Sequence, residues 1–411
     1  MGNTNIKHQR HERDTIVSKK TETIGNEYDR YNQCQSSLKW WGIVKGSNNC
    51  LYCIPFLANR ILKIDPSNDE IKLVGENCDN GGWRSGFARG DFIYCIPCYA
   101  NRFLKFNIKT ETSELVGDDL GNDQSKWRSG AVAEDGCFYC FPSCHTRILK
   151  FDPSNDTTSF VGEEIEGEFK FSATIKAKNG LYGIPNCASR VTKFNFATQK
   201  VTFIGDKFEG DWKWEGGLDG MDNNIYGVPH IQKKWLKIDT ATETTSLVGN
   251  DLCEYGGDKY NGGVVGEDCN VYSVPYNANK VIKYNTTTQK SSEVGNRYDG
   301  DNKWSGGVLH PNGYIYCSPL HDKRVLKIKT NHIREEGIKL LQSNASLTGF
   351  MKYINTYNFE YIYVTHKALY NRLVAYRNKL IVESAMLALR GKADEVGRQM
   401  APPICSYLEV C

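Results

Sequence analysis

The chain has 411 residues, more than one hydrophobic core usually serves, although repeat architectures avoid this limit because each unit packs only on its neighbours. Its 51 Lys and Arg residues nearly balance 48 Asp and Glu residues, which gives a formal net charge of +3. This balance excludes proteins that hold nucleic acid or membranes through a large surplus of positive charge, so we expect no nucleic-acid partner.

The N-terminal segment, residues 1–14, is expected to be a flexible tail. It lacks the apolar core of a signal peptide, and no apolar run in the chain approaches the length of a membrane span. We therefore expect a cytoplasmic protein without a transmembrane segment. Gly2 begins half of an N-myristoylation motif, but Ile6 stands where the motif requires Ser or Thr, which favours a solvated tail over a lipid anchor.

Residues 15–25 contain the first predicted strand, and its sequence has a counterpart far along the chain. The segment Thr21–Asp29 resembles Ser291–Asp299, which ends one of the repeats described next. An isolated copy of the last strand of a repeat indicates that this segment completes a repeat at the other end of the chain.

The tetrapeptide Tyr-x-x-Pro recurs seven times at intervals of 42 to 46 residues. Its prolines are Pro55, Pro97, Pro142, Pro185, Pro229, Pro275 and Pro319. A period of this length indicates either propeller blades or helical arrays. Within each period, short segments rich in Val, Ile, Tyr and Phe alternate in polarity and are separated by Gly, Asn and Asp, which predicts four short strands and not two helices.

A fixed internal register accompanies the period. Five residues after each proline stands Arg or Lys, three further on stands Lys, and twelve beyond that Lys stands a glycine that follows Val or Ile, except in the seventh repeat. There Lys339 occupies the glycine position, so the seventh repeat lacks its outer strand. We expect the N-terminal strand to supply it and to close the ring, which hides strand edges that would otherwise pair with other chains.

The inner strand of each repeat begins at an aromatic residue that small residues follow. The aromatic residues are Trp40, Trp83, Trp127, Phe171, Trp214, Tyr260 and Trp304. Small residues suit strands that converge on one axis. The aromatic residues could stack on a sugar or a base, but a residue type that recurs in every unit is better explained as part of the core.

The patterns Trp-x-Gly-Gly-Val, Ile-Tyr-x-Ile-Pro and Val-Leu-Lys-Ile-Asp resemble those of β-propeller repeat proteins in general, over residues 15–337. They depart from kelch repeats, in which a glycine pair closes the second strand, and from WD40 repeats, in which Trp-Asp ends a blade. The resemblance and the register together predict an all-β, seven-bladed β-propeller closed by an N-terminal outer strand. The resemblance implies a fold and no chemistry.

The first basic residue of the register forms a ring at the start of the third strands, and this ring is the sharpest candidate binding site. It comprises Arg60, Arg102, Arg147, Arg190, Lys234, Lys280 and Arg324. Seven cations on one face could hold a phosphate or another anion. Alternatively, each cation pairs within its blade with the Glu, Asp or Asn that follows the outer-strand glycine, as Arg147 with Glu163. We favour this structural role because the net charge leaves no surplus for a ligand.

The histidines and cysteines are weaker candidates. His145, His230 and His321 lie in loops between second and third strands, where they could hold a metal or act as a general base, but their scattered positions favour surface histidines. The 15 cysteines are expected to be free thiols, and those next to the repeated Tyr to fill the core. Because Cys-x-x-Cys within a strand points its thiols to opposite faces, we expect neither a metal nor a cofactor.

Residues 338–411 are expected to form a mainly helical C-terminal extension. A strand is predicted at residues 359–364, followed by a helix from about His366 to Arg398. The apolar stripe of this helix consists of Leu369, Leu373, Tyr376 and Leu380. This stripe must either dock on the propeller, which we favour, or bind another protein.

We interpret the chain as a non-enzymatic scaffold whose loop face or C-terminal helix engages a protein partner. Two alternatives stay open. A propeller that binds a small molecule, an anion or a glycan would hold its ligand in the axial mouth. A lyase-like or hydrolase-like propeller enzyme would bring His and carboxylate side chains together from different blades. The oligomeric state does not follow from the sequence.

Overall fold

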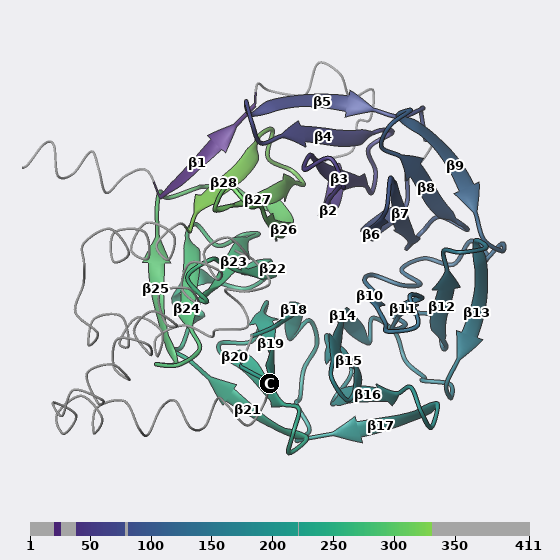
Figure 1. Cartoon of the computed structure of the whole chain (residues 1–411). Coiled ribbons are helices and arrows are strands. Elements are labelled where there is room, and N and C mark those ends of the chain that lie inside the picture. The colour runs from purple at the N-terminus through teal and green to yellow at the C-terminus, as the bar shows by residue number, and fades with distance from the viewer. Residues whose placement is uncertain (1–19, 26–37, 79–80, 221, 331–411) are drawn as a thin grey trace, which may run out of the picture. The chain divides into compact units, whose positions relative to one another are not determined.

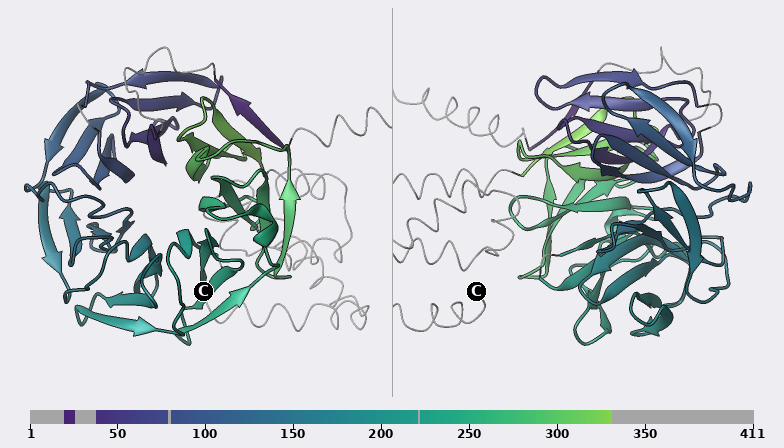
Figure 2. Two further views of the ribbon diagram at one scale, coloured as in Figure 1. Left: turned by 180° about the vertical axis from the view of Figure 1, so that it is seen from behind. Right: turned by 45° about the vertical axis from the view of Figure 1, so that its right-hand side comes forward.

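The computed structural model describes residues 20–25, 38–78, 81–220 and 222–330. They form seven four-stranded antiparallel sheets around a central axis, as Figure 1 shows. Figure 2 shows the same ring from behind and from the side. The predicted all-β, seven-bladed β-propeller is therefore confirmed. The N-terminal tail with Gly2 and the C-terminal extension with its apolar stripe lie outside the described residues.

The blades follow one another in chain order, and their strands are numbered from the axis outward. Blade 1 comprises β2 (Trp40–Lys45), β3 (Leu51–Pro55), β4 (Ile61–Asp65) and β5 (Glu70–Val74). Blade 2 comprises β6 (Trp83–Arg89), β7 (Phe92–Pro97), β8 (Phe103–Asn107) and β9 (Thr112–Val116). Blade 3 comprises β10 (Ala131–Val132), β11 (Phe138–Cys140), β12 (Ile148–Asp152) and β13 (Thr157–Val161). Blade 4 comprises β14 (Phe171–Ala177), β15 (Gly180–Pro185), β16 (Val191–Asn195) and β17 (Lys200–Ile204).

The remaining blades repeat this order. Blade 5 comprises β18 (Trp214–Asp219), β19 (Asn224–Pro229), β20 (Trp235–Asp239) and β21 (Thr244–Val248). A short 3-10 helix, η2 (Cys253–Tyr255), leads to blade 6, which comprises β22 (Tyr260–Val265), β23 (Val271–Pro275), β24 (Val281–Asn285) and β25 (Lys290–Val294). Blade 7 comprises β26 (Trp304–Leu309), β27 (Tyr314–Pro319), β28 (Val325–Lys329) and the N-terminal β1 (Thr21–Ile24).

Strand β1 closes the ring as the register predicts. It pairs antiparallel with β28, from Thr21 opposite Ile328 to Ile24 opposite Val325. An ion pair of 3.3 Å between Glu22 and Lys327 supports the same register. The first strand of the chain is therefore the outer strand of the last blade.

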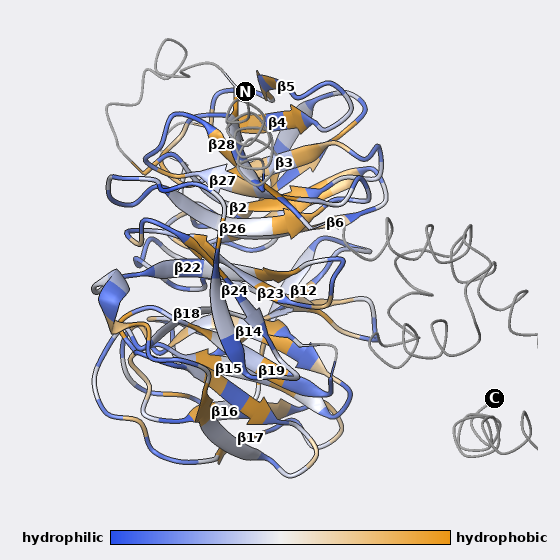
Figure 3. Ribbon diagram, turned by 90° about the vertical axis from the view of Figure 1, so that its left-hand side faces the viewer, coloured by the Kyte–Doolittle hydropathy of each residue, from blue (hydrophilic) through white to orange (hydrophobic). Residues whose placement is uncertain are grey.

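The hydrophobic core lies between neighbouring blades. Among the described residues, each of seven apolar clusters combines side chains from two adjacent blades. For example, Tyr52 and Ile54 of blade 1 pack with Ile93 and Phe106 of blade 2. Figure 3 shows hydrophobic residues gathered on the strands and hydrophilic residues on many of the connecting loops. Each blade can bury its apolar faces only against its neighbours, which explains why the ring needs closure.

The repeated aromatic residue of the inner strand belongs to this core. Trp40 is buried, lies opposite Pro55 and donates its indole N–H to the carbonyl oxygen of Arg60 at 2.7 Å. The equivalent indole bond occurs in blades 2, 3, 5 and 7. These contacts support the interpretation that the repeated aromatic residues belong to the core and do not bind a ligand.

The second repeated Lys of the register joins neighbouring blades. Four of these lysines reach an acidic residue in the turn between the third and fourth strands of the following blade. The pairs are Lys63–Glu111, Lys105–Asp156, Lys193–Glu243 and Lys327–Asp69. In blade 4 that turn residue is Gln199, and Lys150 of blade 3 pairs instead with Asp135 of its own blade at 3.0 Å.

We expect Lys105→Met and Asp156→Asn each to lower the free energy of unfolding by about 1 kcal/mol, because the pair spans 2.5 Å in a mostly buried setting. Chemical denaturation of both single variants and of the double variant measures the coupling. The control is Lys237→Met, since the corresponding turn residue is Gln289 and Lys237 has no ion pair among the described residues. Fully additive effects of the two substitutions would contradict this linkage.

The described cysteines are free thiols, and Cys53, Cys95, Cys140 and Cys317 of the second strands are fully buried. Burial raises the pKa of Cys53 to about 12. These four thiols therefore fill the core. No helix within the described part of the chain is long and apolar enough to cross a membrane.

Candidate functional site

The position directly after the repeated aromatic residue breaks the symmetry of the blades. In chain order it holds Trp41, Arg84, Arg128, Ser172, Glu215, Asn261 and Ser305. In six blades the strand register shifts directly after the aromatic residue or one residue later, and such a bulge re-aims side chains. Five of the seven residues line one cavity of about 470 Å³: Trp41, Arg84, Arg128, Glu215 and Asn261.

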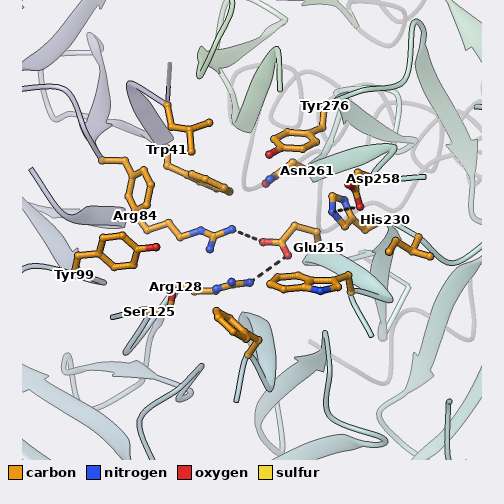
Figure 4. A pocket seen from close by; sticks show the side chains of 15 residues that line it. Trp41, Arg84, Tyr99, Ser125, Arg128, Glu215, His230, Asp258, Asn261 and Tyr276 are labelled. Atoms are coloured by element: carbon orange, nitrogen blue, oxygen red, sulfur yellow. Dashed lines mark hydrogen bonds and ion pairs between the residues drawn. The ribbon is translucent and has the colours of Figure 1, made fainter. Parts of the chain in front are cut away.

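Two sets of loop residues complete the cavity, as Figure 4 shows. The first set lies two residues before the aromatic residue and includes Ser125, Phe169, Trp212 and Asp258, all with positive φ. The second set follows the repeated proline and comprises Phe56, Tyr99, His230, Ile231 and Tyr276. The cavity therefore collects side chains from six consecutive blades, 1 to 6.

A cluster of three charged side chains lies in the middle of the cavity. Glu215 of blade 5 accepts a hydrogen bond of 2.6 Å from Nη2 of Arg84 and faces Nη1 of Arg128 at 3.5 Å. The amide of Asn186 donates to the same carboxylate at 2.9 Å. All three charged side chains are at most 7% exposed. Figure 4 shows both guanidinium groups pointing at Glu215.

The electrostatics of this cluster leave one positive charge uncompensated. Burial, followed by the neighbouring charge of Arg128, lowers the pKa of Arg84 to about 10 although Glu215 opposes this shift. Arginine side chains are not deprotonated in proteins near neutral pH. Two cations therefore face one carboxylate, and Nε of Arg128 is buried without a hydrogen-bond partner.

Aromatic rings cover the faces of both guanidinium groups. Cζ of Arg84 lies 3.7 Å from the ring centroid of Trp41, and Cζ of Arg128 lies 5.2 Å from Phe169 and 5.3 Å from Trp212. The rings of Phe169 and Trp212 are 5.0 Å apart. Such cation–π contacts are strongest where water is excluded, so they help to keep both arginines charged in a buried site.

Among the predicted site residues that the structure describes, His230 is the one that lines the cavity. Its Nε2 lies 3.2 Å from the carboxylate of Asp258, and its Nδ1 lies 2.9 Å from the carbonyl oxygen of Tyr260. The hydrogen bond from His230 lowers the pKa of Asp258. Both ring nitrogens thus face acceptors, and His230 comes from blade 5 whereas Asp258 leads into blade 6.

The predicted basic ring lies away from the cavity. Its members begin the third strands, and none of Arg60, Arg102, Arg147, Arg190, Lys234, Lys280 and Arg324 lines the cavity. Arg102 and Lys280 donate instead to the carbonyl oxygens of the outer-strand glycines, Gly117 at 3.1 Å and Gly295 at 3.2 Å. A role in anion binding stays a prediction for this ring.

The predicted pairing of Arg147 with Glu163 is wrong. Both residues are described, and no ion pair joins them; Glu163 accepts a hydrogen bond of 3.0 Å from the backbone N–H of Val201 on the neighbouring blade. The other two predicted histidines also lie outside the cavity: His145 stacks on Phe160 at 4.9 Å, and His321 is exposed.

Sequence reasoning missed Arg84, Arg128 and Glu215. The signal was present, because these residues follow a strictly repeated aromatic residue at a position where the residue type changes from blade to blade. A residue type that recurs in every blade indicates a role in the fold. A variable position next to it is a candidate for a role in function.

Comparisons with known proteins establish the fold. No family model matches the chain, and no curated protein matches its sequence. A streptogramin B lyase structure is similar with a TM-score of 0.61 at 14% identity, over 76% of this chain and 97% of that one. A catalytically inactive virginiamycin B lyase from Staphylococcus aureus with quinupristin gives 0.59 at 14% identity, over 75% and 99%. Hydrazine synthase of Kuenenia stuttgartiensis gives 0.58 at 12% identity, over 74% and 99%. At these identities the likeness extends to the propeller fold alone.

Proposed function

We propose that this propeller binds a small molecule in its axial cavity. One observation carries the proposal: the residue that follows the repeated aromatic residue varies among the blades, and at this position two arginines and one glutamate come together from three blades. A volume of about 470 Å³ lies within the range of ligand pockets, and the lining combines aromatic rings with a few polar groups.

The fold itself does not require these charges. Ser172 and Ser305 occupy the equivalent position in blades 4 and 7, so a small neutral side chain satisfies the architecture. Burying an ionised group costs several kcal/mol even when it is paired. Keeping Arg84, Arg128 and Glu215 at a position where serine suffices is therefore best explained by a ligand.

A protein-interaction scaffold remains the alternative for surfaces outside the cavity. The C-terminal helix on which it rested lies outside the described residues. The cavity gives this alternative no support, since its charged groups are almost completely buried and a protein surface could not reach them without inserting a side chain.

A lyase-like enzyme is the second candidate, and the contact between His230 and Asp258 favours it because the two residues come from different blades. Streptogramin B lyase shares the fold. Both ring nitrogens of His230 nevertheless lie within 3.2 Å of protein oxygen atoms, those of Asp258 and of the Tyr260 carbonyl, so the protein itself already occupies the positions where a substrate would meet them. Binding is therefore better supported than catalysis.

Ligand-observed NMR with a library of planar aromatic, aliphatic and sugar fragments tests the proposal. We expect several fragments to compete for one site and Trp212→Ala to weaken them by about tenfold, since loss of a stacking ring costs about 1–3 kcal/mol. Phe203→Ala is the matched control, because that ring is 60% exposed on β17 and outside the cavity. A library in which no fragment depends on Trp212 would overturn the proposal.

A further inference from the structure

We propose that the ligand of the axial cavity is a planar aromatic monoanion, such as an aromatic monocarboxylate, and that Glu215 excludes dianions. This inference rests on the proposed binding function and names its ligand class. The juxtaposition that carries it is an under-paired, buried Arg128 beside a packed pair of aromatic rings, Phe169 and Trp212, with Glu215 3.5 Å from its Nη1.

The charge of the cavity lining limits the charge that a ligand can carry. The buried charges of the lining belong to Arg84, Arg128 and Glu215 and have a formal sum of +1, whereas the side chain of Asp258 is 50% exposed and bonded to His230. A buried charge is stable only when it is paired. One further negative charge would complete the cluster. A second would face Glu215 without a cation of its own.

The two arginines are unequally paired with Glu215, and this difference indicates which of them binds the anion. Arg84 makes a short bond of 2.6 Å to Glu215 and has its face covered by Trp41. Arg128 reaches the same carboxylate only at 3.5 Å, and its Nε has no partner although its side chain is 5% exposed. A guanidinium group has several N–H donors in a plane, and Arg128 combines a long bond to Glu215 with a buried Nε that has no partner. Arg128 is therefore the group that receives the anion.

The surroundings of Arg128 define the rest of the ligand. Phe169 and Trp212 pack on each other beside the guanidinium group, and Tyr99 and Ile231 on the lining expose 37% and 46% of their surface. Flat apolar walls beside a cation favour a planar body that stacks on the rings while its carboxylate reaches the arginine. An inorganic anion would leave these walls uncovered.

Glu215 then sets the permitted charge. Its carboxylate lies between the two guanidinium groups and takes up one of their two charges. A dianion would place its second charge beside this carboxylate, and like charges in a water-poor site repel strongly. Glu215 is thus inferred to be a specificity-determining residue that favours monoanions.

Isothermal titration at neutral pH with naphthoate, naphthamide and naphthalene dicarboxylate tests the inference. We expect naphthoate to bind at least about tenfold more tightly than the neutral amide, because a charge-assisted hydrogen bond is worth about 1.5–3 kcal/mol. In Glu215→Gln the preference between dicarboxylate and naphthoate should shift toward the dicarboxylate by about tenfold or more. Glu163→Gln, which removes a carboxylate outside the cavity, should leave that preference unchanged.

Each outcome separates this inference from the proposed function. Equal affinities for naphthoate and naphthamide, or no binding of naphthoate, would overturn the ligand class, while Trp212-dependent fragments would still support a binding cavity. An unchanged charge preference in a folded Glu215→Gln variant would overturn the role of Glu215. If that variant fails to fold, Arg128→Gln serves instead: it should weaken naphthoate about tenfold and spare naphthamide, and equal effects on both would count against the inference.

Discussion

A chain that lacks residues 1–25 is expected to unfold at a much lower temperature than the full chain, or not to fold. Strand β1 covers the edge of β28 with four residue pairs. Thr21 also ties blade 7 to blade 6: its hydroxyl accepts hydrogen bonds of 2.8 Å from the backbone of Asn296 and of 2.9 Å from Tyr298. With each bond worth about 1 kcal/mol net, the loss approaches the whole stability of an ordinary domain.

Thermal unfolding followed by circular dichroism measures this effect. Deletion of residues 1–14 is the matched control, because it shortens the N-terminus and leaves β1 intact, so its melting temperature should equal that of the full chain. A second, milder variant is Thr21→Val, which removes the hydroxyl and keeps the strand; we expect it to cost about 1–2 kcal/mol. An unchanged melting temperature after loss of residues 1–25 would disprove closure by β1.

The architecture could be predicted because its determinants repeat. Each proline lies opposite the aromatic residue that opens the inner strand, as Pro55 lies opposite Trp40, and each outer strand ends at a glycine. A residue pattern that the packing of every blade requires recurs seven times in one chain and can therefore be recognised from the sequence alone. The absence of a last strand in the seventh repeat, together with the likeness of Thr21–Asp29 to Ser291–Asp299, predicted closure by residues 15–25, and Thr21–Ile24 form that strand.

Contacts between blades could not be predicted in the same way. The sequence shows which residues are neighbours within a unit, and the pairing of Arg147 with Glu163 was inferred from that proximity. In the structure Glu76 and Glu163 instead cap the following outer strand, accepting hydrogen bonds from the backbone of Ser113 at 2.6 Å and Val201 at 3.0 Å. Twist and stagger between neighbouring sheets decide these contacts, and a one-dimensional repeat does not contain them.

The candidate site was missed for a related reason. Arg84, Arg128 and Glu215 are 44 and 87 residues apart along the chain, and only the closed ring brings them within hydrogen-bonding distance. Of the predicted site residues within the described part of the chain, His230 alone lines the cavity. The predicted partner helix, with Leu369, Leu373, Tyr376 and Leu380, lies outside the described residues and stays a prediction.

The glycine that follows Glu215 is expected to be the most sensitive residue at the axis. Gly216 has φ of +86°, and a Cβ atom there would lie 2.8 Å from the Cα atom of Gly262 in the next blade. Gly262 and Gly306 meet the backbone of the blade after them in the same way, at 3.2 Å and 2.9 Å. Four consecutive blades therefore touch backbone to backbone at the axis, where a new methyl group cannot be accommodated by rotating a side chain.

We expect Gly216→Ala to lower the free energy of unfolding by about 3 kcal/mol or more, combining backbone strain of about 1–2 kcal/mol with overpacking of about 1–3 kcal/mol. Gly210→Ala is the matched control, since Gly210 has the same φ of +86° and open space where its Cβ would lie, so it reports backbone strain alone. Chemical denaturation of both variants separates the two costs. Equal destabilisation would mean that the blades do not press together at Gly216. A larger loss in Gly216→Ala, accompanied by weaker binding of fragments beside the adjacent Glu215, would show that the same close approach that joins the blades also positions the site.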